Sequence, residues 1–326
     1  MYPRGNYHTL ISKNHLQNPR KIMLIKTPDQ LEITVSLVAD LIAEQFPHWS
    51  HLSIKPVAYG GHDNRTFHLG EEMLIRLPSA EKYAAKVQIE QKWLPLLAPH
   101  LSYAIPQPIA MGNPSQQYPW HWSIYRWLEG NSANTLYIDD IHLSVIAAQL
   151  AQFLNELHKI PPMDGPTPGL HNFYRGDSLE AYDSETQHAL VHLHGIVDVD
   201  TITDAWKQAL SSQWSKSPVW IHGDLSVGNI LIKDNRLTAV IDFGGMGVGD
   251  PACDLVIAWI FLKQESRQIF KSLVNLDRKT WERAQGWALW KALITLVPLQ
   301  DVTCAEAVKQ KQIIEDIIAE HLSKGQ

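Results

Sequence analysis

Three oxygen-bearing side chains occur close together in an order that could perform chemistry: Asp224, Asn229 and Asp242. A carboxylate within hydrogen-bond reach of an alcohol can accept its proton as the alcohol attacks a phosphoryl group. Amide and carboxylate oxygens are the hard ligands that Mg²⁺ prefers when it bridges phosphates. The pattern predicts γ-phosphoryl transfer to a hydroxyl group, with Asp224 as the catalytic base and Asn229 and Asp242 as ligands of Mg²⁺.

The neighbouring segments predict how these side chains are brought together. Apolar, β-rich segments at 230–232 and 237–241 are typical of a hairpin, with Asp224 and Asn229 on the loop before it and Asp242 directly after it. Each residue alone is more often a turn former. Together they match the kinase template H-R-D-L-x-x-x-N followed by D-F-G, except that Gly223 replaces the Arg. The joint match favours the chemical interpretation.

Four residues near these positions are predicted to have structural roles. His222 is interpreted as a packed, hydrogen-bonded residue, because Asp224 already provides a base, and Gly223 as a residue that leaves room. Asp250 precedes a proline and a long apolar run, which predicts the start of a helix over 251–262. Asp254, in the first turn of that helix, is favoured by the helix dipole and can hold the catalytic loop in place.

The nucleotide side of such a site needs a loop over the phosphates and a cation on a strand. Gly60 and Gly61 lie between apolar segments and are predicted to form that loop, although most glycine pairs are simply hairpin turns. Residues 73–78 predict a strand with Arg76 in its middle, where kinases carry a lysine. Arg76 can bind phosphate bidentately, and Lys86 is the alternative cation.

Further residues are predicted to complete the nucleotide site. Glu90 lies in a helical run over 83–97 and is expected to orient the strand cation; the alternative is a solvated helix charge. Residues 119–130 predict a strand that runs into a hinge, whose backbone would bind the purine edge. Tyr125 and Trp127 mark this neighbourhood, although aromatic residues there are more often part of the core.

These residues resemble the aminoglycoside phosphotransferase family of small-molecule kinases. Residues 222–229 are similar to its H-G-D-x-x-x-x-N loop, and residues 249–255 to its G-D-P-x-x-D-L run. The resemblance extends from about residue 30 to the end and is strongest over 220–259. It implies an α+β, two-lobed protein-kinase-like fold with a small β-rich N-lobe and a larger helical C-lobe, and ATP or GTP as co-substrate.

The acceptor is predicted to be a small molecule. Gly244 and Asp250 are too close in the sequence for an activation loop on which a peptide could dock. An aminoglycoside-like antibiotic is the first candidate, since acidic residues outnumber basic ones over 131–222 and would attract a polycation, although most of them are better explained as solvated helix faces. The alternatives are an endogenous alcohol or amino alcohol, or a catalytically silent nucleotide-binding protein, which only Arg76 favours.

Composition and charge narrow the remaining possibilities. The chain has 326 residues, a net charge of −6 and two cysteines. A broad nucleic-acid surface is not expected, and the cysteines predict inert thiols in a cytoplasmic protein without a membrane span. Residues 1–26 are predicted to form an N-terminal extension, with Met23 as an alternative start, residues 27–130 the nucleotide-binding N-lobe and hinge, and residues 131–326 the catalytic and acceptor-binding C-lobe. A first helix is predicted from Thr27, with Leu31 and Val35 on its apolar face.

Overall fold

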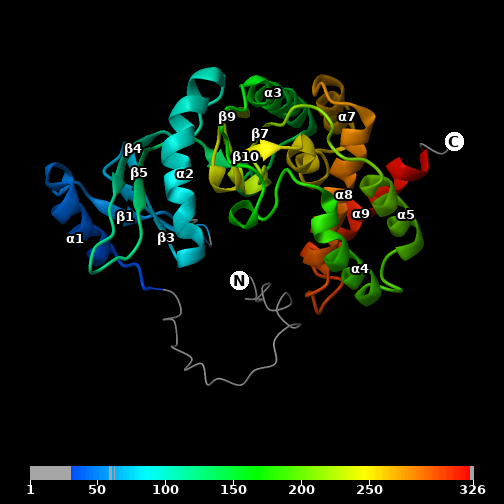
Figure 1. The fold of residues 1–326 in the computed structure, drawn as a ribbon, viewed down its shortest axis with the longest axis horizontal. Helices are drawn as coiled ribbons and strands as arrows, with labels where there is room; N and C mark the ends of the chain where they lie inside the picture. Colours follow the sequence, from blue (N-terminus) through cyan, green and yellow to red (C-terminus); the bar gives the residue numbers. More distant parts are fainter. Residues whose placement is uncertain (1–30, 59–60, 62, 324–326) are drawn as a thin grey trace.

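The computed structural model describes residues 31–58, 61 and 63–323. The predicted extension at 1–26, its Met23, the predicted cap Thr27 and the predicted phosphate-loop residue Gly60 all lie outside the described residues. At one end of the molecule an antiparallel sheet has the strand order β1-β2-β3-β5-β4 (Figure 1). Its strands are β1 (Ile54–Pro56), β2 (Asn64–Leu69), β3 (Met73–Pro78), β4 (Pro108–Gly112) and β5 (Trp122–Arg126).

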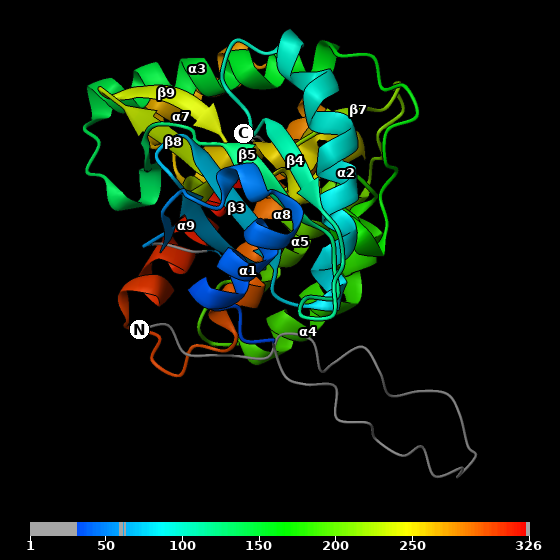
Figure 2. The ribbon, with the colours of Figure 1, turned by 90° about the vertical axis from the view of Figure 1, so that its left-hand side faces the viewer.

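Two helices pack on this sheet. Helix α1 (Val35–Gln45) contributes Val38, Leu41 and Ile42 to a core that it shares with β2, β3 and β5. Helix α2 (Glu81–Leu97) runs along the other side of the sheet (Figure 2). Its last turns contribute Trp93 and Leu97 to the second, larger core. Because α2 belongs to both parts, it fixes the sheet against the catalytic hairpin.

The prediction that α1 includes Leu31 was wrong. The described residues before Val35 are not helical, and Thr34 caps the helix by accepting the N–H of Leu37 at 3.2 Å. Thr34 has an extended backbone, which is what a capping threonine requires. A cap at this position satisfies a free N–H of the first turn, and it outweighs the apolar spacing that pointed further upstream.

The remainder of the described chain is mainly helical and surrounds two small sheets. One has the order β6-β8-β9 and the other pairs β7 with β10. Their strands are β6 (Asn131–Ser132), β7 (Val219–Ile221), β8 (Ile230–Lys233), β9 (Arg236–Val240) and β10 (Gly247–Gly249). The helices are α3 (Asp140–Lys159), α4 (Asp183–His192), α5 (Val199–Leu210), α6 (Ile257–Ile260), α7 (Gln264–Leu273), α8 (Arg278–Leu296) and α9 (Ala305–Ser323).

Short 3₁₀ helices connect these elements at the site. The most relevant are η4 (Leu170–Asn172), η6 (Val227–Asn229), η7 (Phe243–Gly245) and η8 (Pro251–Val256). The single helix predicted over 251–262 is in fact η8 followed by α6. Asp250 nevertheless caps it, since its carboxylate accepts the N–H of Ala252 at 3.1 Å. The rest of the predicted two-lobed α+β fold is confirmed, with a sheet-rich N-terminal part and a helical C-terminal part.

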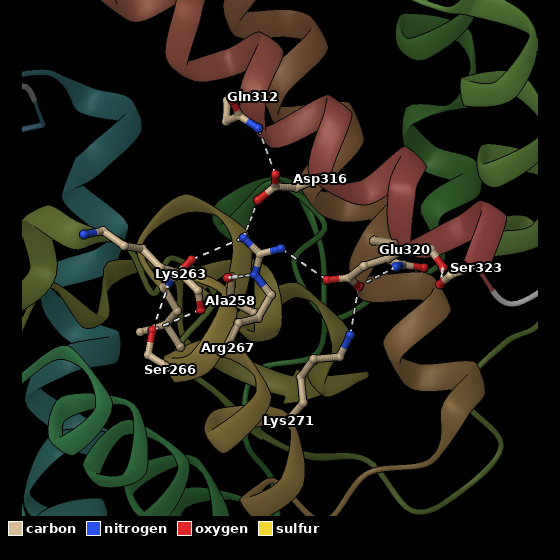
Figure 3. Close-up of polar contacts among 11 residues, drawn as sticks. Ala258, Lys263, Ser266, Arg267, Lys271, Gln312, Asp316, Glu320 and Ser323 are labelled. Atoms are coloured by element: carbon tan, nitrogen blue, oxygen red, sulfur yellow. Dashed lines mark hydrogen bonds and ion pairs between the residues drawn. The ribbon is translucent and has the colours of Figure 1, made fainter. Parts of the chain in front are cut away.

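The C-terminal helix is fastened to α7 by a buried cation (Figure 3). Arg267 on α7 is 5% exposed and contacts Asp316 at 2.5 Å and Glu320 at 3.2 Å, both on α9. Its Nε also donates to the carbonyl of Ala258 at 2.9 Å. Lys271 adds a second, more exposed contact to Glu320 at 2.8 Å. Through these contacts the buried guanidinium links α6, α7 and α9.

No helix in the described part of the chain has both the length and the apolar character that crossing a membrane requires.

Candidate active site

The loop between β7 and η6 carries Asp224 at the surface. The backbone of this loop is fixed by a buried carboxylate. His222 is buried, and its backbone N–H and that of Gly223 donate to the two carboxylate oxygens of Asp254 at 2.7 and 2.8 Å. Burial raises the pKa of Asp254, and His222 and the two N–H groups oppose that rise. These contacts agree with the predicted structural role of Asp254, which fixes the loop without reaching the solvent.

The ring of His222 connects Asp224 to the strand before Asp242. The N–H of Asp224 donates to Nδ1 of His222 at 3.2 Å, and Nε2 lies 2.9 Å from the carbonyl oxygen of Ile241. Because Nδ1 accepts a hydrogen bond, Nε2 is the nitrogen that carries the proton and donates to Ile241. Both ring nitrogens are therefore engaged, which leaves His222 unsuited to act as a general base and supports the structural interpretation.

Asn229 and Asp242 face the site from adjoining segments. The side-chain amide of Asn229 donates to the carbonyl of Asp224 at 2.9 Å, and its backbone carbonyl accepts the N–H of Ile241 at 2.9 Å. Asp242 follows β9 with a left-handed backbone, φ 65°. Partial burial alone would raise the pKa of Asp242, but the charge and hydrogen bond of Arg76 outweigh it, and the pKa is lowered.

The donor set at this position fits a divalent cation. Asp242 offers a carboxylate that stays ionised, and the amide oxygen of Asn229 is directed away from the bond that its nitrogen makes to Asp224. Both are the oxygen donors that Mg²⁺ selects, and the metal would complete its shell with water and phosphate. The residues present are therefore suitable for holding Mg²⁺.

Arg76 joins the two halves of the site. Its Nη1 donates to both carboxylate oxygens of Glu90, at 3.0 and 3.3 Å, and its Nη2 donates to Asp242. Glu90 is buried and also accepts the hydroxyl of Tyr125. The strand cation and the helix acid that sequence reasoning paired are thus in contact. Their contact with phosphates stays a prediction.

Tyr125 lies on β5, within the segment predicted to run into a hinge, and it belongs to the core, as aromatic residues there more often do. Tyr125 is 2% exposed and offers no open face to a purine. Its hydroxyl donates a hydrogen bond to Glu90. Trp127 is half-buried, with its ring centroid 4.2 Å from that of His68, and its backbone N–H donates to the backbone carbonyl of Glu72 at 2.7 Å. Gly61 is exposed, and a Cβ added there would meet no atom within 4 Å.

Two further residues on the nucleotide side are brought together by the fold. Lys86 contacts Asp63 at 2.9 Å and lies over Gly244, where an added Cβ would be 2.9 Å from its Cδ. Lys86 therefore stays a second candidate for the phosphates. Sequence reasoning missed Asn64, whose amide oxygen, when turned toward Arg76, accepts Nε and Nη2 at 3.1 and 3.0 Å. These residues line a small pocket together with Arg76 and its partners. The pocket is formed by Asn64, Arg76, Lys86, Val87, Glu90 and Tyr125.

A second pocket has Asp224 in its wall. Sequence reasoning did not find its charged and aromatic residues, because they come from segments far apart in the chain. Of its charged residues, only Asp224 had been singled out from the sequence. The pocket is lined by Arg175, Gly223, Asp224, Leu225, Ser226, Cys253, Val256, Ile260, Trp287, Trp290 and Lys291.

The sheet, the helical part and the ion pair that joins them define a two-lobed protein-kinase-like fold. Solved structures share it: wild-type aminoglycoside 2'-phosphotransferase-IIIa in complex with GDP aligns with a TM-score of 0.63 at 20% identity, over 87% of this chain and 98% of that one. A macrolide 2'-phosphotransferase from Brachybacterium faecium aligns with a TM-score of 0.56 at 19% identity, over 85% and 96%. These likenesses concern the fold.

Sequence comparison identifies the family. The model of the phosphotransferase enzyme family matches residues 53–292, so the chain belongs to that family. An aminoglycoside 3'-phosphotransferase of Escherichia coli is 30% identical over 132 residues, which cover 39% of this chain and 47% of that protein. A second one, also of Escherichia coli, is 26% identical over 60% of this chain and 70% of its own length. The chain thus spans about half the length of the first of these relatives.

Proposed function

We propose that this protein transfers the γ-phosphoryl group of ATP or GTP to a hydroxyl group of a small molecule. The observation that carries the proposal is the placement of Arg76, which binds Glu90 and Asp242 at once. This contact joins the sheet to the segment that follows the catalytic hairpin, where a nucleotide's phosphates would meet an acceptor. We assign residues 27–130 to the nucleotide side and residues 131–326 to catalysis and acceptor binding.

Each residue has a distinct task in this proposal. Asp224 accepts the proton of the attacking hydroxyl, while Asn229 and Asp242 hold Mg²⁺. When bound, Mg²⁺ neutralises charge on the phosphates. Arg76, oriented by Glu90, binds the phosphates from the sheet, with Lys86 close by. The exposed position of Asp224 in the wall of the second pocket supports its role, since an acceptor could reach it directly.

The first candidate acceptor is an aminoglycoside-like antibiotic. Relatives are named as phosphotransferases of aminoglycosides and macrolides. The acidic surplus at 131–222 gives little support to a polycationic acceptor here, because many of these acids have other partners. Asp139 and Asp198 cap α3 and α5, respectively. Glu156 accepts the backbone N–H of Ser102, and Asp164 forms an ion pair with Lys92. An endogenous alcohol or amino alcohol is the alternative acceptor.

The test is nucleotide consumption with Mg²⁺, using ATP and GTP separately, across aminoglycosides, macrolides and metabolite alcohols. Stimulation by one class of acceptor, with the phosphorylated product seen by mass spectrometry, supports the proposal. Binding of nucleotide that depends on Mg²⁺, with no turnover for any acceptor, would instead indicate a silent nucleotide-binding protein. Stimulation that persists after Asp224 is replaced would show that the base has been misassigned.

A further inference from the structure

The pocket beside Asp224 has a positive lining. Of the described residues that form its wall, Asp224 is the only acid, whereas Arg175 and Lys291 both carry positive charge. Trp287 and Trp290 provide its aromatic surface. The charge that an acceptor meets here is therefore positive, apart from the one carboxylate needed to remove its proton. This lining is poorly suited to a polycation, since like charges in a partly desolvated pocket repel.

Arg175 is placed as a binding group. Its guanidinium lies over the rings of Trp287 and Trp290, 5.0 and 4.8 Å from their centroids. Within the described residues no carboxylate forms an ion pair with Arg175, which is only half-buried. A guanidinium stacked on indole rings is held in place, while the donors along its edge remain directed outward for a carboxylate or phosphate.

The loop that carries Arg175 is held rigidly. The side chain of the buried Asn172 accepts the N–H of Gly169 at 3.0 Å and donates to the carbonyl of Arg175 at 3.1 Å. Phe173 and Tyr174 both have left-handed backbones, φ 55° and 54°. Strained conformations of this kind persist where the surroundings enforce them, often at binding sites. The position of Arg175 is thus fixed before any ligand arrives.

The other charged groups in and near the pocket are Lys291, Glu185 and Asp254. Lys291 lies on α8, one turn beyond Trp287, with Nζ 3.7 Å from Oδ1 of Asp224. Glu185 accepts the indole N–H of Trp290 at 2.8 Å and does not line the pocket. The buried Asp254 binds the N–H groups of the catalytic loop. Because Lys291 pairs with Asp224, an anionic group entering the pocket would meet Arg175 as the cation without an ion-pair partner among the described residues, and it would meet no acid other than Asp224 on the wall.

We propose that the acceptor is an alcohol that carries an anionic group, a carboxylate or a phosphate, and that Arg175 binds this group. The inference rests on the proposed phosphotransferase function and names its substrate class. The acceptor oxygen forms a bond to the γ-phosphorus as the bond from that phosphorus to the β,γ-bridging oxygen breaks. The bonding electrons leave with the nucleoside diphosphate, and the hydroxyl proton passes to Asp224. The indole rings contact the apolar face of the acceptor.

The test uses acceptors that differ in one group. Glucuronate, glucose and glucosamine form one set; glycerate, glycerol 3-phosphate, glycerol and 3-amino-1,2-propanediol form another. Aminoglycosides are included as polycations. We expect kcat/KM for the acids or the phosphate to exceed that for the matched neutral and amine compounds by about 10- to 100-fold, the range of one charge-assisted contact. The two anions distinguish a carboxylate from a phosphate as the preferred group.

A second experiment reverses the charge at Arg175. In Arg175→Glu we expect the preference to move toward the amines, whereas Arg175→Gln loses the preference without reversing it. Lys279→Glu is the matched control, because Lys279 is an exposed cation on the same helix as Trp287 and Lys291 but outside the pocket. It should keep the wild-type preference. Melting temperatures and nucleotide affinity establish that each variant is folded.

The outcomes separate the two proposals. If neutral alcohols, amines or aminoglycosides are phosphorylated as efficiently as the anions, or if Arg175→Glu keeps the wild-type preference, the anionic acceptor is overturned and the phosphotransferase function stands. If no compound of any charge stimulates nucleotide consumption by wild type, both proposals fall.

Discussion

A Cβ on Gly223 would lie 2.0 Å from the carbonyl oxygen of Gly245. The catalytic loop and the segment after Asp242 are therefore in backbone contact, and Gly223 has φ 80° as well. Any side chain at this position would separate the two segments. This contact explains physically why a glycine occupies the place where the protein-kinase template has an arginine.

We expect Gly223→Ala to destabilise the protein more than Gly195→Ala. Gly195 has nearly the same φ, 79°, but a Cβ there would meet nothing within 4 Å. The left-handed backbone alone costs about 1 kcal/mol for an alanine, which is the loss expected at Gly195. The additional loss at Gly223 measures the backbone contact. Urea unfolding of both variants gives the comparison, and equal losses would mean that the two segments separate easily.

Asp224→Asn should abolish most turnover and leave nucleotide binding unchanged. The amide has the shape of the carboxylate but cannot take the proton, and such a loss lowers kcat by about 10²- to 10⁴-fold. Asp204→Asn is the control, an exposed aspartate on α5. Steady-state kinetics and nucleotide titration check both. A kcat within a few-fold of wild type would remove Asp224 from the mechanism.

Arg76→Met should destabilise the fold as well as weaken nucleotide binding. It leaves Glu90 buried without its cation, and breaking a buried pair costs about 3 kcal/mol. Adding Glu90→Gln should recover part of that stability, though not the nucleotide affinity. Lys86→Met, measured alongside, shows which cation binds the phosphates. If Lys86→Met alone raises the nucleotide Kd, the phosphate contact belongs to Lys86.

Asp277 should contribute stability that depends on pH. It caps α8, which carries Trp287 and Lys291, by accepting the N–H of Thr280 at 3.0 Å, and it pairs with Lys216 at 2.7 Å. Burial would raise the pKa of Asp277, but Lys216 and Thr280 outweigh it and lower the pKa from 3.8 to about 2.

A lowered carboxyl pKa favours the folded state above the unfolded pKa, and this contribution is lost as the pH falls through the folded pKa. Because the side chain is 44% exposed, we expect only about 1 kcal/mol for Asp277→Ala at pH 7. The difference from wild type should shrink as the pH falls from 3.8 toward about 2. Denaturant unfolding at several pH values measures it; a difference independent of pH would indicate a purely steric cap.

Arg267→Met should loosen the C-terminal helix. It removes the charge that Asp316 and Glu320 share, and we expect a loss of about 3 kcal/mol. Lys271→Met, which removes a more exposed contact to Glu320, should cost less than about 1 kcal/mol. Thermal or urea unfolding compares the two. Equal losses would show that burial of Arg267 contributes nothing beyond an ordinary ion pair.

The sequence by itself was enough to predict the catalytic hairpin and the secondary structure around it. The strand predicted at 73–78 is β3 as observed, and the helix predicted over 83–97 lies within α2. The catalytic loop and the hairpin lie within one short segment, residues 222–242. Their conformation therefore depends largely on local backbone preferences of the residue types. The family resemblance, and with it the two-lobed fold, depends on this stretch together with residues 249–255.

Only the tertiary structure decided what faces Asp224 and what Tyr125 does. Arg175, Trp287 and Lys291 have no periodicity or spacing in common with the catalytic loop, because α8 and the loop after η4 meet only when the larger core forms. The contact by which Tyr125 donates its hydroxyl to Glu90, buried beside Arg76, likewise joins residues far apart in the sequence. Contacts between distant segments are selected by packing and by the pairing of buried charges, which a linear sequence pattern does not record.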